Sequence, residues 1–133
     1  MALLLVRLPR ERPVHARSCF TRTGTQVERE RIFREAARIV AAEFQRPLTA
    51  EEVARRVAVS PRHLRRVFSE VYETSFRSYL AQVRMLRAAE LVACSDLPIG
   101  EIARRVGYRE PSQFTKAFKR AHGATPSDAR RGC

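Results

Sequence analysis

Three arginines, Arg62, Arg65 and Arg66, lie in a stretch whose apolar residues follow helical spacing. The apolar residues recur at i, i+3, i+4 and i+7 and therefore share one helix face: Leu64, Val67, Phe68 and Val71. The arginines and Ser69 keep this spacing two positions earlier, so they lie about 200° around the helix, nearly opposite the apolar stripe. A guanidinium carries paired N–H donors that fit phosphate oxygens or the two major-groove acceptors of guanine. This helix is predicted to bury one face and to present cations to a polyanion on the other.

A second stretch repeats this division of faces with different polar residues. Its apolar stripe consists of Phe114, Ala117, Phe118 and Ala121. The other side carries hydroxyl, amide and ammonium groups, from Ser112, Gln113, Thr115, Lys116 and Lys119. For one helix alone, an ordinary solvated face is the simpler interpretation. Two such helices, both basic or polar, favour reading of base edges in the major groove, where arginine pairs with guanine and glutamine with adenine.

Both stretches belong to an internal repeat. Residues 52–57 read EVARRV and residues 101–106 read EIARRV, at an offset of 49. Beyond the following turn the offset becomes 50 and relates Pro61 to Pro111, Leu64 to Phe114 and Phe68 to Phe118. A repeat of this length indicates one supersecondary unit used twice. Each copy is a short helix, a tight turn and a second helix, which is the helix-turn-helix arrangement.

Capping residues and apolar spacing locate the helices. Thr49 with Glu52 forms a capping box, in which each side chain satisfies a backbone amide at the helix start. Ser60 caps the next helix, with Pro61 in its first turn, where a missing N–H costs nothing. Helices are expected at about residues 28–46, 50–57, 61–71, 75–93, 100–106 and 111–121. The long helix at 75–93 is apolar on more than one face, which predicts that it packs against a lobe at each end.

The predicted fold is therefore all-α, with two helix-turn-helix subdomains joined by a long linker helix. Residues 1–27, which carry five arginines and include Gly24, are expected to form a basic, disordered arm. Residues 28–133 are expected to form the bilobed domain, divided into 28–74, 75–94 and 95–133. A linker helix of about 28 Å suits two recognition helices that enter successive major grooves about 34 Å apart.

The net charge also favours a polyanionic partner. Lys and Arg number 26 against 14 acidic residues, which gives a formal charge of +12. Such a field attracts nucleic acid, although a basic composition also serves solubility or binding to an anionic membrane. The apolar run at residues 2–6 is too short for a signal-peptide core or a membrane span. The sequence therefore predicts a soluble cytoplasmic protein without a membrane partner.

No catalytic or metal-binding constellation accompanies these motifs. The cysteines and histidines form no ligand-like cluster, at Cys19, Cys94, Cys133, His15, His63 and His122. An enzyme is therefore not expected, nor is a cofactor or a metal, and Cys94 is expected to be half-buried rather than nucleophilic. The closer alternatives are a nonspecific nucleic-acid-binding protein, which charge alone would produce, and a module that interacts with RNA polymerase.

The most specific stretch of the sequence lies in the second copy of the repeat. It reads SDLPIGEIA over residues 95–103 and continues with Gly107-Tyr108, Phe114, Phe118-Lys119-Arg120, Gly123 and Pro126. From about residue 28 to residue 130 the chain resembles the DNA-binding domain of the AraC/XylS family of transcriptional regulators. The resemblance implies a bilobed helical domain that binds double-stranded DNA and activates or represses transcription through contact with RNA polymerase.

The resemblance also assigns residues to the DNA contacts. Base contacts fall to Arg62, Arg65 and Arg66 in the first copy, and to Ser112, Gln113, Thr115 and Lys116 in the second. Phosphate contacts are expected from helix starts and nearby side chains, at Thr49, Ser60 and Arg77. Many relatives carry a sensing and dimerising domain, for which the residues before the first helix are too few. We therefore expect no small-molecule effector site within this chain and binding as a monomer, in a stand-alone protein or as part of a longer one.

Three positions depart from the family pattern. Ala58 stands in the first turn, where many relatives have glycine, whereas the second turn keeps Gly107. If the turn needs a left-handed residue there, alanine costs about 1–2 kcal/mol. Pro98 stands where a capping Ser or Thr is common, which predicts a weaker helix start. Ala129 replaces a frequent aromatic residue, which predicts a less well packed final helix.

Overall fold

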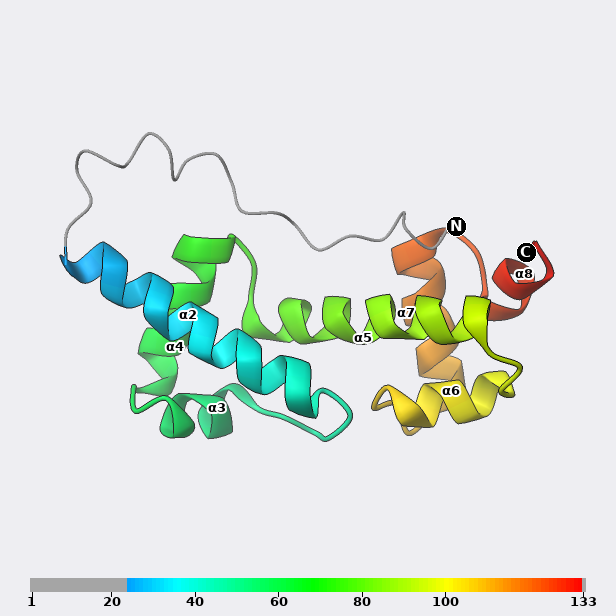
Figure 1. Cartoon of the computed structure of the whole chain (residues 1–133), viewed down its shortest axis with the longest axis horizontal. Helices are drawn as coiled ribbons and strands as arrows, with labels where there is room; N and C mark the ends of the chain where they lie inside the picture. The colour runs from blue at the N-terminus through cyan, green and yellow to red at the C-terminus, as the bar shows by residue number, and fades with distance from the viewer. Residues whose placement is uncertain (1–23, 133) are drawn as a thin grey trace. The chain divides into compact units, whose positions relative to one another are not determined.

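The computed structural model describes residues 24–132, a range that contains helices and no strand (Figure 1). In chain order these are α2 (Gly24–Glu43), α3 (Ala50–Arg56), α4 (Pro61–Val67), the π-helical turn η2 (Phe68–Tyr72), α5 (Phe76–Cys94), α6 (Ile99–Arg105), α7 (Pro111–His122) and α8 (Pro126–Arg131). The prediction of an all-α fold is confirmed. Within the described range, no helix is long and apolar enough to cross a lipid bilayer.

The described residues divide into two compact units, each considered by itself. The first unit comprises residues 24–43 and 48–80, and the second comprises residues 44–47 and 81–132. The long helix α5 contributes to both cores. Phe76, Tyr79 and Leu80 are buried on its first-unit part, and Met85, Ala88, Ala89 and Val92 on its second-unit part. This sharing accounts for apolar residues that cover more than one face of the helix.

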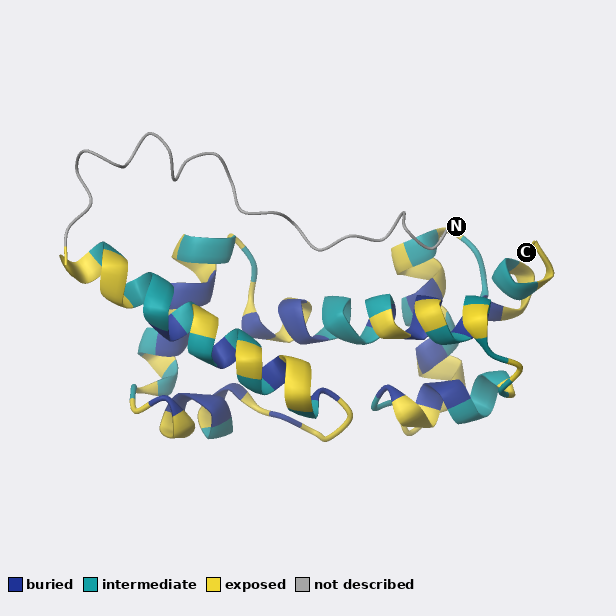
Figure 2. Cartoon of the chain, viewed as in Figure 1, coloured by how far each residue is buried: buried dark blue, intermediate teal, exposed yellow. Residues whose placement is uncertain are grey.

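The core of the first unit is an aromatic cluster beneath α2 and α4. Its rings come from Phe33, Phe68, Tyr72, Phe76 and Tyr79, and the ring centroids of the six neighbouring pairs lie 5.0–5.7 Å apart. Helix α2 adds fully buried aliphatic side chains to this core (Figure 2). Of the apolar stripe predicted for the next helix, Leu64 and Val67 of α4 and Phe68 of η2 are buried, whereas Val71 is half-buried. A bidentate ion pair ties α3 to α2, because both guanidinium nitrogens of Arg56 lie 2.8 Å from the carboxylate oxygens of Glu43.

The second unit has a smaller aromatic core. Phe114 and Phe118 of α7 are almost fully buried, their ring centroids lie 5.8 Å apart, and Tyr108 packs against Phe114 at 5.7 Å. Ile102, Ala103 and Val106 of α6 complete the contact between the two helices. Ala121 is exposed and Ala117 half-buried, so the predicted apolar stripe of α7 is buried only at its two phenylalanines.

Three helix boundaries differ from the sequence-based expectation by three residues or more. Helix α2 ends at Glu43, before the expected end at residue 46. Helix α2 begins at Gly24 rather than at residue 28, so residues 24–27 belong to this helix and not to the arm. The rest of the expected arm, residues 1–23, lies outside the described residues. Helix α4 ends at Val67 and passes directly into η2, which ends where Glu73 adopts a left-handed conformation at φ 59°. A single π-helical turn is too short to change the hydrophobic spacing recognisably, so the sequence pattern could not separate it from the α-helix that it continues.

The C-terminal end of the second unit is a short helix. Pro126 begins α8, whose first turn is capped by Thr125: its hydroxyl accepts a hydrogen bond of 3.1 Å from the amide of Asp128. Helix α8 forms although Ala129 supplies no aromatic ring, because Arg130 holds it. The Arg130 guanidinium donates hydrogen bonds to the carbonyls of Val92, Leu97 and Ser95 at 3.2, 2.6 and 3.0 Å.

Candidate nucleic-acid interface

Both helix-turn-helix units are closed by the same turn. The amide of Val59 bonds the carbonyl of Ala54 at 2.9 Å, and in the second copy the amide of Tyr108 bonds that of Ala103 at 2.9 Å. The preceding residue is left-handed in each copy, Ala58 at φ 63° and Gly107 at φ 105°. This pattern is a helix C-terminus of the Schellman type, which requires a positive φ at that position. The first turn therefore carries an alanine in a conformation that favours glycine.

The cap of α4 orients its arginines toward solvent. The Ser60 hydroxyl accepts a hydrogen bond of 3.0 Å from the amide of His63, and Pro61 occupies the first turn. Leu64, Val67 and Phe68 are fully buried on one side, and the three predicted base-contacting arginines, Arg62, Arg65 and Arg66, are exposed on the other. Among residues 24–132, neither Arg62 nor Arg66 has a carboxylate within ion-pair distance.

Arg65 differs from its two neighbours. Its Nη2 donates a hydrogen bond of 2.6 Å to Oε2 of Glu51, which stands in the first turn of α3. The pKa of Glu51 lies below its ordinary value, first because its own backbone amide stabilises the carboxylate and then because Arg65 donates to it. Sequence reasoning missed Glu51, although the repeat contained a signal for it. The position 49 residues later is Gly100, and the residue equivalent to Arg65 is Thr115.

Helix α7 presents the corresponding face of the second unit. Pro111 begins the helix and Gly123 ends it in a left-handed conformation, with its amide 2.8 Å from the carbonyl of Lys119. The predicted contacts Ser112, Gln113 and Lys116 are exposed, whereas Thr115 is half-buried.

The start of α6 lacks a side-chain cap, as the proline at position 98 predicts. The carbonyl of Pro98 instead accepts a hydrogen bond of 3.0 Å from the amide of Ile102.

Two of the three predicted phosphate contacts line one hollow of the first unit. The hollow has a volume of about 860 Å³, and Thr49 and Arg77 border it together with Arg65, Ser69 and Ser75. Thr49 caps α3 and accepts the amide of Glu52 at 3.1 Å, while the hydroxyl of Ser75 accepts the amide of Ser78 at 3.0 Å at the start of α5. The carboxylates of Glu51 and Glu73 also border the hollow. The third predicted contact, Ser60, does not.

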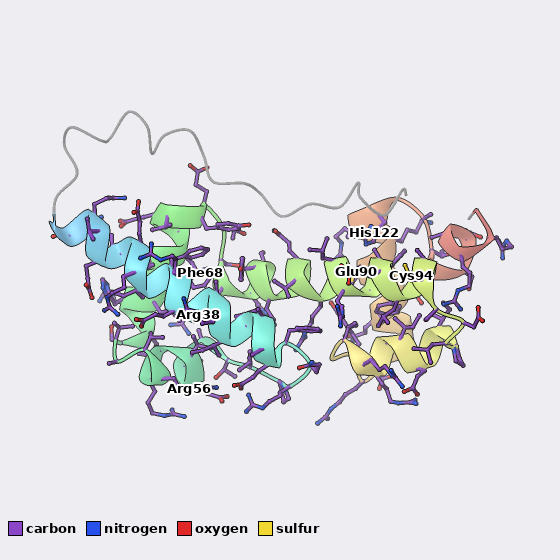
Figure 3. All side chains as sticks on the ribbon, in the orientation of Figure 1. Arg38, Arg56, Phe68, Glu90, Cys94 and His122 are labelled. Carbon is purple, nitrogen blue, oxygen red and sulfur yellow. The ribbon has the colours of Figure 1, made fainter. Side chains whose placement is uncertain are left out.

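The remaining reactive groups lie apart from these surfaces. Cys94 is exposed at the end of α5, so the expectation that it is half-buried is wrong (Figure 3). His122 lies at the end of α7, where its ring packs on that of Phe118 at 4.2 Å between centroids. In the part of the chain that the structure describes, no three His, Cys, Asp or Glu side chains gather closely enough to hold a metal ion.

Two helix-turn-helix units with exposed polar second helices define the class of a tandem helix-turn-helix DNA-binding domain. Residues 53–132 match the family described as "Helix-turn-helix domain", and the chain belongs to the AraC/XylS-type DNA-binding domains within it. A similar solved structure is the C-terminal domain of AraT, a response regulator from Geobacillus stearothermophilus. It is 41% identical, with a TM-score of 0.74 over 77% of this chain and 85% of that one.

Two further comparisons bear on function. The DNA-binding domain of AdpA, solved in complex with a target DNA, is 26% identical to this chain, with a TM-score of 0.70 over 74% of this chain and 88% of that one. The HTH-type transcriptional regulator GlxA from Rhizobium meliloti is 41% identical over 88 residues, which are 66% of this chain and 27% of that protein. The chain therefore spans only about a quarter of the length of this relative.

Proposed function

We propose that this domain binds double-stranded DNA in a sequence-specific manner and regulates transcription, with α4 and α7 each inserted in a major groove. The observation that carries the proposal is the matched division of faces on the two helices. Leu64 and Val67 of α4 and Phe114 and Phe118 of α7 face the core. On both helices, cationic or polar side chains face solvent. Arg62 and Arg66 on α4 and Lys116 on α7 are positioned to meet base edges or phosphates without first breaking an ion pair within residues 24–132.

The proposal assigns base contacts to Arg62, Arg65 and Arg66 on α4, and to Ser112, Gln113, Thr115 and Lys116 on α7. It assigns phosphate contacts to Thr49, Ser60 and Arg77. The hollow beside α4 supports the first and last of these, because it combines two helix starts with two guanidinium groups. Its two carboxylates oppose a phosphate, and the guanidinium of Arg65 is paired with one of them, so the attraction of the hollow for a phosphate depends chiefly on Arg77.

The finer parts of the proposal concern partners and place of action. A relative from Staphylococcus xylosus, 32% identical over 65% of this chain, is named a lactose operon transcription activator. We include activation through contact with RNA polymerase in the proposal on the strength of the family. One chain carries two recognition helices, so a monomer is sufficient to occupy an asymmetric site. We propose the cytoplasm as the place of action, because DNA is the proposed partner. The proposed function includes no catalytic step.

The test is selection of bound sites from a random duplex library, followed by two paired variants. The wild type is expected to enrich two half-motifs about one helical turn apart, near 10 base pairs between centres. The double variant R62A/R66A is expected to lose one half-motif, and Q113A/K116A the other, because each removes the readout of one groove.

A matched control removes the same charge from elsewhere in the first unit. Arg34 and Arg38 are exposed on α2, one turn apart, and Arg38 is labelled in Figure 3. R34A/R38A lowers the net charge as much as R62A/R66A does. The control is expected to keep both half-motifs. A nonspecific polyanion binder would enrich no motif. Its affinity for DNA would fall equally in R62A/R66A and R34A/R38A and would decrease as the salt concentration rises.

A further inference from the structure

Glu51 is the one carboxylate that engages a predicted base-contacting residue within residues 24–132. The pair joins α3 to α4 across 14 residues of sequence, with 2.6 Å between Oε2 of Glu51 and Nη2 of Arg65. Both side chains are open to solvent, at 59% exposed for Glu51 and 55% for Arg65. An exposed pair contributes little to folding stability, so its place on the recognition surface calls for another explanation.

The internal repeat supplies a comparison within the same chain. In the second unit, Thr115 stands where Arg65 stands in the first, and Gly100 stands where Glu51 stands. The unit without the arginine is therefore also without the glutamate. By contrast, the neighbouring Glu52 is matched by Glu101, and both form ion pairs with arginines of their own helix. The carboxylate at position 51 is thus present in the unit whose recognition helix carries the arginine and absent from the other unit. The carboxylate at position 52, by contrast, is present in both units.

A carboxylate in this position changes what Arg65 gains from DNA. Only one nitrogen of the guanidinium is bound to Glu51, and to leave it the arginine must find acceptors at least as good. The paired O6 and N7 of guanine meet this condition. A phosphate is a charged acceptor of the same kind as Glu51, so exchange of the carboxylate for a phosphate brings Arg65 little gain. The negative charge of Glu51 also repels the phosphates nearby.

We propose that Glu51 determines the selectivity of the first recognition helix: it holds the guanidinium of Arg65 away from phosphates and yields it to a guanine. Glu51 is thus a positioning residue that acts through Arg65 and lowers nonspecific affinity more than specific affinity. This inference rests on the proposed function, because it requires that α4 read bases.

The test measures the DNA affinity of the wild type, E51Q, R65A and the double variant E51Q/R65A. Each protein is measured on three duplexes: the selected site, the same site with the base pair read by Arg65 replaced, and unrelated DNA. That base pair is the one whose preference disappears in R65A. A good bidentate contact discriminates by about 5- to 150-fold. E51Q is expected to reduce this discrimination by about 3-fold or more and to raise the affinity for unrelated DNA. The released arginine adds one phosphate contact, which steepens the salt dependence of nonspecific binding by about 0.9 in log–log slope.

The double variant separates selectivity from simple charge. Without Arg65 there is no guanidinium to release, so E51Q is expected to leave the salt slope unchanged in the R65A background. E90Q is the matched control: Glu90 on α5 is 52% exposed and pairs with Arg87 at 3.0 Å (Figure 3). It is expected to leave base discrimination as in the wild type.

Two negative results have different meanings. If the wild type enriches a motif but E51Q keeps its discrimination and salt slope, the role of Glu51 is overturned and the proposed function stands. If the wild type enriches no motif, the proposed function fails and the role of Glu51 with it. Equal effects of E51Q and E90Q would also overturn the inference, because they would show that charge alone is responsible.

Discussion

The guanidinium of Arg84 lies in the space that a side chain at residue 107 would need. A β-carbon on Gly107 would come within 2.8 Å of Nε of Arg84. Arg84 has little freedom to move, because it donates hydrogen bonds of 2.8 Å to the carbonyls of Phe44 and Arg46 and packs over the ring of Tyr108 at 5.7 Å. Gly107 is thus required twice, for its left-handed backbone at φ 105° and for the close approach of Arg84.

We therefore expect G107A to be destabilising. The left-handed conformation costs alanine about 1–2 kcal/mol, and displacement of Arg84 from its carbonyls adds about 1–3 kcal/mol. Urea denaturation should show a loss of about 2–5 kcal/mol in the free energy of unfolding. The control is G100A, where a β-carbon meets nothing within 4 Å on helix α6. It should be neutral or stabilising by up to about 1 kcal/mol, and a loss as large as that of G107A would contradict this account.

Ala58 gives a prediction of opposite sign in the equivalent turn. The substitution A58G relieves about 1–2 kcal/mol of left-handed strain, partly offset by about 0.5–1 kcal/mol from the greater freedom of glycine in the unfolded chain. The net expectation is a gain of up to about 1.5 kcal/mol, measured as a higher urea midpoint at unchanged slope. A lower midpoint would mean that the methyl group of Ala58 makes contacts worth more than the strain.

Arg130 is expected to stabilise the C-terminal end of the second unit. R130M keeps much of the aliphatic length but leaves the carbonyls of Val92, Ser95 and Leu97 without their donor. Partly buried carbonyls left unsatisfied cost about 1–3 kcal/mol. The neighbour Arg131 is 73% exposed and forms an exposed ion pair with Asp128, so R131M should change the free energy of unfolding by under about 0.5 kcal/mol. Similar losses in both variants would argue against a special role for Arg130.

These contacts mark the limit of what the sequence could predict. The repeat placed the helix pairs and both recognition faces, because apolar spacing and capping residues act locally. The bonds of Arg84 and Arg130 to carbonyls 33–40 residues away were not predictable, since every residue carries a carbonyl and no side-chain pattern marks the acceptor. Glu51 is an intermediate case: its pairing is nonlocal, but a comparison of the two repeat copies would have found it.

His122 gives a prediction about pH. Burial lowers the pKa of His122 below its ordinary value of 6.5, and the hydrogen bond with the carbonyl of Met85, at 3.2 Å from Nε2, opposes this only in part. Between the folded and unfolded pKa values the unfolded chain binds more protons, so stability rises with pH there. The contribution of His122 should be complete above pH 6.5 and should diminish as pH falls below it. We expect the melting temperature of H122Q to fall less than that of the wild type when the pH is lowered from about 7.5 to about 5, a range that includes the ordinary histidine pKa of about 6.5. Parallel curves for the two proteins would show that His122 titrates alike in the folded and unfolded chains.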